Sequence, residues 1–127
     1  MSKSFVKNAM YIASQLSEED ALCQIAEEAA ELAQAALKLR RAITGTNPTP
    51  KSRAEAIANL LEEVVDVDVS LAVWMAYPNK DIDYTGKKEQ TSAKFERWAS
   101  RIRAKNNTKE GGENAEEDKQ QTEGRTV

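Results

Sequence analysis

The stretch Glu27-Glu28-Ala29-Ala30-Glu31 decides how this chain folds. It lies within a run from Ser17 to Ile43 that has no Gly or Pro and is rich in strong helix formers. Through this run apolar residues recur in alternating steps of three and four, which predicts a long amphipathic helix: Leu22, Ile25, Ala29, Leu32, Ala36, Leu39 and Ile43. Glu28 and Glu31 are three residues apart, so they are neighbours at the edge of this stripe, with Glu28 nearer its centre.

A second stretch repeats the pattern. Its apolar residues again step by three and four: Ile57, Leu60, Val64, Val67, Leu71 and Trp74. Glu63 and Asp66 hold the same phase on this helix that Glu28 and Glu31 hold on the first. The breaker segment 44–50, with one Gly and two Pro, joins the two helices. A connection this short predicts that they are antiparallel neighbours.

The two acidic pairs are matched in height as well as in phase. Glu28 with Asp66, and Glu31 with Glu63, are each centred in sequence on Asn47, the middle of the connection. Residues equidistant from the tip of a hairpin lie at the same level. We therefore expect four carboxylates to converge on one spot, far from the tip and beside an apolar core.

Such a cluster is costly for the protein alone, because carboxylates held together and partly out of water repel one another. A divalent cation removes this cost. Oxygen ligands without His or Cys suit hard ions, so the pattern indicates Mg²⁺, with Mn²⁺ as an alternative. The other interpretation is that these acids are the solvated faces of Glu-rich helices.

The spacing Glu27-Glu28-x-x-Glu31 followed by Glu63-x-x-Asp66 resembles the signature of the MazG-like all-α nucleoside triphosphate pyrophosphohydrolases, a superfamily that includes the dimeric dUTPases and the dCTP pyrophosphatases. The resemblance covers about residues 5 to 104, and the gap between the two motifs is longer than is usual in that family. It implies that Mg²⁺ is held by Glu28, Glu31, Glu63 and Asp66. It also implies an all-α four-helix bundle that assembles as a homodimer or homotetramer.

Composition is consistent with a soluble helical domain. The chain has 127 residues, 40% of them hydrophobic and 31% charged, and a net charge of −3, which argues against a general nucleic-acid binder. A single cysteine, Cys23, excludes an internal disulfide and is expected to pack inside the fold of a cytoplasmic protein. No His is present, which argues against most zinc sites. We expect neither a signal peptide nor a membrane span.

The rest of the chain predicts two further helices. Residues 4–16 form a short first helix, on which Tyr11 is a candidate for contact with a nucleotide base, since relatives place aromatic residues there. After a turn-rich segment, 78–86, a fourth helix is expected from Lys87 to about Ala104, with Phe95, Trp98 and Ile102 along its apolar side.

Three basic residues of this fourth helix, Lys94, Arg97 and Arg101, lie on one face. They resemble the basic residues that MazG-like proteins place near the triphosphate, although a solvated basic face would look the same. From residue 105 the chain becomes polar and Glu- and Gln-rich, so we expect a helical domain over 1–104 and a disordered tail over 105–127.

The sequence and the resemblance together lead to one functional expectation. We expect an Mg²⁺-dependent enzyme that cleaves a nucleoside triphosphate between the α and β phosphates, giving the monophosphate and pyrophosphate. Glu27, or one of the metal ligands, would orient or deprotonate the attacking water. The alternative is a catalytically silent helical module that binds a nucleotide or a partner protein.

Overall fold

The computed structural model describes the chain except for residues 1, 49, 79–85 and 124–127, and describes side chains only as far as residue 109. Its described residues form four helices and no strand: α1 (Lys3–Gln15), α2 (Glu18–Thr44), α3 (Arg53–Met75) and α4 (Lys87–Glu123). The predicted all-α class is confirmed. The chain divides into two compact units, residues 1–82 and 83–127, so α1, α2 and α3 are described together and α4 by itself.

The ends of the helices follow from local chemistry. Ser17 caps α2, where its hydroxyl accepts a hydrogen bond from the Asp20 amide at 3.0 Å. Gly45 ends α2 in the left-handed conformation, with φ at 65°. Ser52 and Glu55 form a capping box at the start of α3, and the hydrogen bond from the Ser52 amide holds the pKa of Glu55 below its usual value. The predicted first helix, 4–16, and the predicted helical run from Ser17 to Ile43 agree with α1 and α2 to within about two residues.

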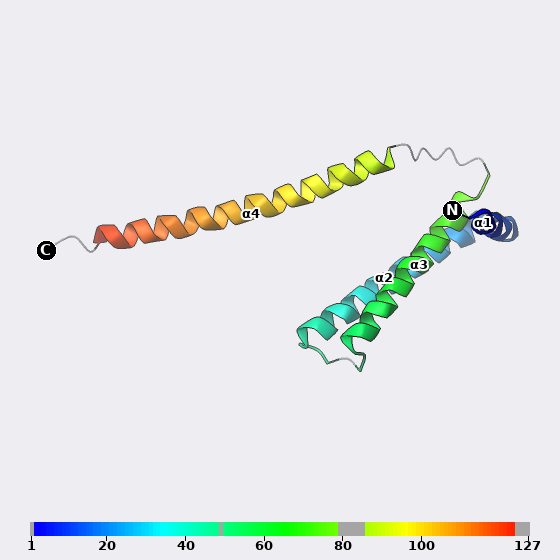
Figure 1. Ribbon diagram of the computed structural model, residues 1–127, viewed down its shortest axis with the longest axis horizontal. Coiled ribbons are helices and arrows are strands. Elements are labelled where there is room, and N and C mark those ends of the chain that lie inside the picture. Colours follow the sequence, from blue (N-terminus) through cyan, green and yellow to red (C-terminus); the bar gives the residue numbers. More distant parts are fainter. Residues whose placement is uncertain (1, 49, 79–85, 124–127) are drawn as a thin grey trace. The chain divides into compact units, whose positions relative to one another are not determined.

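The hairpin of α2 and α3 is the body of the first unit. The two helices lie side by side and antiparallel, and α1 packs against α3 near the end opposite the connecting loop (Figure 1). Two long-range contacts fix that end. The Tyr77 hydroxyl lies 2.9 Å and 2.8 Å from the carbonyl oxygens of Leu16 and Ser17, and the Trp74 indole N–H donates to Glu18 at 3.3 Å.

The seam between the helices is narrower and more polar than the apolar stripes predicted. On α2 the covered residues include Ala21, Ile25, Glu28, Leu32 and Ala35, and on α3 they include Ala56, Leu60, Glu63, Val67 and Ser70. Several residues of the predicted stripes are exposed instead: Leu22, Ala29, Ala36, Ile43, Ile57 and Val64. The covered line of each helix keeps half of the predicted stripe, including Ile25, Leu32, Leu60 and Val67, and shifts by one residue at the positions between them. Small and acidic side chains take those shifted positions between the helices.

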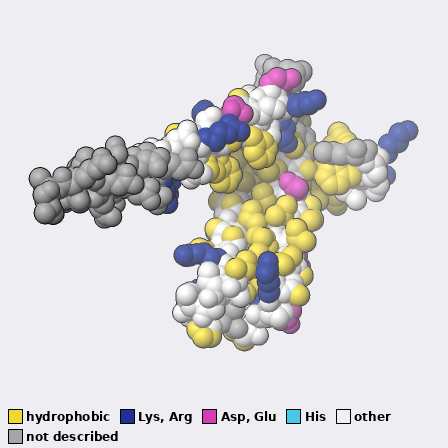
Figure 2. All heavy atoms as spheres, turned by 60° about the vertical axis from the view of Figure 1, so that its left-hand side comes forward, with side chains coloured by type: hydrophobic (Ala, Val, Ile, Leu, Met, Phe, Trp, Pro, Cys, Tyr) yellow, Lys and Arg dark blue, Asp and Glu magenta, His cyan; other side chains and the backbone are white. Residues whose placement is uncertain are grey.

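Large apolar side chains remain on the outside of this unit as a result. Leu61 is 59% exposed and Val65 57%, and Leu37 on α2 is 56% exposed. Figure 2 shows hydrophobic side chains gathered over the hairpin. Cys23, which was expected to pack inside, is exposed. An exposed apolar surface of this size is typical of a protein that associates with another surface.

The second unit is the helix α4. It begins at Lys87 as predicted but runs to Glu123, well past the expected end near Ala104. Phe95, Trp98 and Ile102 are all more than half exposed. The expected loop at 78–86 lies mostly outside the described residues, and the disordered tail and the domain boundary at residue 104 stay predictions. Within the described part of the chain, no helix is long and apolar enough to cross a membrane.

The burial of alanine side chains between α2 and α3 leads to a prediction about packing. Ala35 is 1% exposed, so the three extra carbon atoms of Ala35→Leu crowd the space toward α3 and are expected to lower the free energy of unfolding by about 1–3 kcal/mol. Ala36→Leu makes the same chemical change at an exposed position of the same helix and should change it by less than about 0.5 kcal/mol. Urea denaturation of both variants measures the difference. An equal loss of stability in the two variants would mean that Ala35 does not lie between α2 and α3.

Candidate metal centre

Three acidic side chains converge on the seam at the level that the sequence predicts. One carboxylate oxygen from each of Glu28, Glu31 and Glu63 lies within 4.8 Å of the others. Glu28 and Glu63 are partly buried and Glu31 is exposed. Glu28 and Glu63 lie on the faces where α2 and α3 meet, and Glu31 lies at the exposed edge of that contact.

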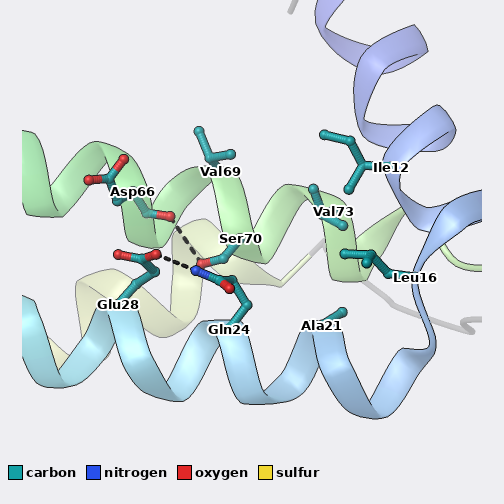
Figure 3. A pocket seen from close by; sticks show the side chains of 9 residues that line it. All are labelled: Ile12, Leu16, Ala21, Gln24, Glu28, Asp66, Val69, Ser70 and Val73. Atoms are coloured by element: carbon teal, nitrogen blue, oxygen red, sulfur yellow. Dashed lines mark hydrogen bonds between the residues drawn. The ribbon is translucent and has the colours of Figure 1, made fainter.

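Asp66 lies next to this group. It is partly buried on α3, and it lines the same end of a cavity as Glu28 on α2 (Figure 3). The pairing of Glu28 with Asp66 across the hairpin agrees with the heights expected from the sequence. The structure therefore places all four of the predicted metal ligands in one neighbourhood.

One acid of this cluster, Glu63, lies in an unfavourable electrostatic environment. The Oε2 atom of Glu63 is buried and has no hydrogen-bond partner among the described residues. Burial raises the pKa of Glu63 above its usual value, and the surrounding carboxylates raise it further: Glu31, Asp66, Glu62 and Glu28. A buried carboxylate oxygen without a partner is the kind of atom that a cation would satisfy.

The donor set fits a hard cation. Mg²⁺ binds oxygen at about 2.1 Å, so oxygens on opposite sides of the ion are roughly 4.2 Å apart. Neighbouring oxygens around the ion are roughly 3.0 Å apart, so the oxygens of Glu28, Glu31 and Glu63, which lie within 4.8 Å of one another, would move closer together on binding one ion. Exposed acids also gather without binding any ion, so this geometry permits a metal site and does not require one.

The other predicted site residues are not brought to the cluster. Glu27 is exposed on α2 and is not one of the three converging acids. Tyr11 is 66% exposed on α1 and does not line the cavity beside Glu28. The role of Glu27 in taking a proton from the attacking water, and that of Tyr11 in contacting the nucleotide base, stay predictions.

The basic residues lie on the separate unit. Lys94, Arg97 and Arg101 are exposed on α4, and the last two flank one shallow groove along that helix. Arg103 on the same helix pairs with Glu96 at 3.2 Å, an exposed ion pair of little energetic value. The contact of the three basic residues with phosphate therefore stays a prediction.

Two polar residues beside the acids were missed from sequence. Gln24 donates a hydrogen bond from Nε2 to Oε1 of Glu28 (Figure 3). Ser70 is 5% exposed and its hydroxyl lies 3.0 Å from the carbonyl oxygens of Asp66 and Val67. The signal for Gln24 was available, because it stands four residues before Glu28 and so on the same face of the helix.

Comparison with known proteins adds no further information about this site. No protein-family model, no curated protein and no solved structure matches the chain.

The raised pKa of Glu63 predicts how stability depends on pH. Such a group binds its proton more tightly in the folded chain than in the unfolded one, so it lowers stability once the pH rises above its folded pKa. Below the ordinary Glu pKa of about 4.3 it has no effect. In chelator-treated buffer, Glu63→Gln should therefore raise the melting temperature at pH 7, and this gain should vanish near pH 4.

The control for this measurement is Glu62→Gln, which removes a charge from the exposed position beside Glu63. It relieves only part of the repulsion, so its gain at pH 7 should be smaller. A Glu63→Gln variant that is less stable than the wild type at pH 7 would contradict the prediction.

Proposed function

We propose that the protein is a Mg²⁺-dependent nucleoside triphosphate pyrophosphohydrolase that acts in the cytoplasm. The observation that carries the proposal is the convergence of Glu28, Glu31 and Glu63 at one level of the hairpin, with a buried oxygen of Glu63 left without a partner. Cleavage between the α and β phosphates comes from the resemblance of the two acidic motifs to the MazG-like enzymes.

The chain's own residues would divide the work as follows. Glu28, Glu31, Glu63 and Asp66 would hold Mg²⁺, which when bound supplies positive charge for phosphate oxygens. Phosphoryl transfer needs positioning and charge neutralisation more than covalent chemistry. Glu27 would accept a proton from the attacking water, and Lys94, Arg97 and Arg101 would balance phosphate charge.

The proposal includes completion of a four-helix bundle in a homodimer or homotetramer. The support for it is the exposed apolar surface of the hairpin, including Leu61 and Val65, together with the exposed apolar side of α4. Light scattering of the full chain tests the assembly. A monomer at micromolar concentration would rule out this part of the proposal and leave the metal centre to be judged separately.

The reaction is tested by pyrophosphate release from a panel of nucleoside triphosphates with and without Mg²⁺. We expect the monophosphate and pyrophosphate as products only when the metal is present. Orthophosphate as the product would leave the metal centre in place but show that the cleavage position is wrong. No release from any substrate, with Mg²⁺ still raising the melting temperature, would favour the silent binding module.

A matched pair of variants tests the metal ligands. Asp66→Asn removes a proposed ligand, and since a bound metal contributes several kcal/mol to the transition state, turnover should fall at least about 100-fold. Asp68→Asn removes an exposed acid two residues further along the same helix and should leave turnover within about twofold of the wild type. Equal activity in both variants would exclude Asp66 from the site.

A further inference from the structure

The loop end of the α2–α3 hairpin carries a concentration of positive charge, which we call the basic tip. Residues 32–54, which form the last turns of α2, the connection and the start of α3, contain no Asp or Glu. Because the two helices are antiparallel, the cations of both lie at this one end of the first unit, where Figure 2 shows Lys and Arg side chains. The basic tip consists of Lys38, Arg40, Arg41, Lys51 and Arg53.

The basic tip is separated from the acids of the candidate metal centre. Arg41 stands ten residues after Glu31 on α2, which is about 15 Å along a helix. Arg53 stands ten residues before Glu63 on α3, at the same separation. The net charge of −3 of the whole chain therefore hides a hairpin whose loop end is positive.

Local helix chemistry accounts for only part of this positive charge. Arg41 lies in the last turn of α2, where the helix dipole favours a cation. Arg53 is the first residue of α3 and Lys51 precedes its N-cap, and a cation at that end opposes the helix dipole. The α3 side of the basic tip is thus positive at a cost to its own helix, which indicates a partner outside the hairpin.

Most of these cations are available to such a partner. Arg40, Lys51 and Arg53 are exposed. Lys51 is engaged within the hairpin, where its Nζ donates to Oδ1 of Asn59 at 3.3 Å. The other four cations form no ion pair with any residue that the structure describes. A cluster of uncompensated cations attracts a polyanion.

We propose that the basic tip binds the phosphate backbone of duplex DNA, without regard to base sequence. Lys and Arg side chains that neutralise phosphates supply this kind of binding. A single strand fits less well, because residues 32–54 contain no Phe, Tyr or Trp on which its bases could stack. A membrane surface fits less well too, because it is bound through aromatic and apolar anchors, and the connection 44–52 has no apolar side chain besides its two prolines.

The division of the cations between two helices suits the DNA duplex. The axes of packed helices are about 8–10 Å apart, and the major groove of B-DNA is about 12 Å wide. Cations on α2 and α3 can therefore reach phosphates of the two strands that border this groove. The major groove of an RNA duplex is deep and narrow, so its phosphates are spaced differently. Binding at the tip is independent of the proposed function, because the tip shares no residue with the metal centre.

The test measures the fluorescence anisotropy of a short labelled DNA duplex as the full chain is added, in chelator-treated buffer at several salt concentrations. Five phosphate contacts release counterions, so log K should fall against log salt concentration with a slope of about −4 to −5. Arg40→Gln/Arg53→Gln removes one exposed cation from each helix. This double variant should make the slope shallower by about 2 and weaken binding at low salt by about tenfold or more.

Two matched double variants serve as controls. Arg40→Lys/Arg53→Lys keeps the positive charge at both exposed positions and should bind with the slope of the wild type. Lys3→Gln/Lys7→Gln removes the same charge from exposed positions of α1, which packs near the opposite end of the hairpin (Figure 1). Because salt screens charges at that separation, it should leave the affinity within about twofold of the wild type.

Four results overturn the inference, and none of them bears on nucleotide hydrolysis. Equal weakening in the tip and α1 glutamine variants would mean that only the net charge matters. Loss of DNA binding in Arg97→Gln/Arg101→Gln, with none in Arg40→Gln/Arg53→Gln, would place the DNA on α4. Tighter binding to single-stranded DNA or to an RNA duplex would exclude the DNA duplex as the partner. No binding to DNA, with binding of the basic tip to phosphatidylserine vesicles, would mean that the partner is a membrane surface.

Discussion

The close approach of α2 and α3 is the constraint on which the rest of the first unit depends. Alanines at Ala35 and Ala56, each almost fully buried, let the two backbones come together. Because the seam is narrow, side chains of medium length reach across it from both helices. Glu28 and Glu63 meet for this reason, and bulkier residues at the same positions on the seam would hold them apart.

The same constraint moves apolar surface to the outside. In this hairpin the covered face of each helix includes small residues such as Ala35 and Ala56, and part of the larger apolar surface lies outside it. Residues such as Leu61 and Val65 are left exposed. The exposed apolar surface and the acid cluster are therefore two results of one choice of helix rotation, and not separate features.

The fold class, three of the four helices and the level of the acids could be predicted from the sequence, because Gly45, Ser17 and the Ser52–Glu55 box mark boundaries with local chemistry. The rotation of α2 and α3 about their own axes could not be predicted in this way. A stripe of Leu, Ile and Val shows which face is apolar, but not whether that face meets the neighbouring helix or a surface outside the chain. Ala35 and Ala36 look alike in a sequence, and only packing buries the first.

The end of α4 was missed because polar, Glu-rich composition suits both an isolated helix and an unfolded tail.

The hydroxyl of Tyr77 has a consequence for the order of folding. It reaches the carbonyl oxygens of Leu16 and Ser17, about sixty positions back along the chain. The turn between α1 and α2 therefore acquires its last hydrogen bonds only when α3 has been made and has paired with α2. The entropic cost of closing a loop rises slowly with its length, so this distant contact costs somewhat more to close than one near the tip of the hairpin. The hairpin of α2 and α3 closes over a much shorter connection, so we expect the contacts near that connection to form before the hydrogen bonds of Tyr77.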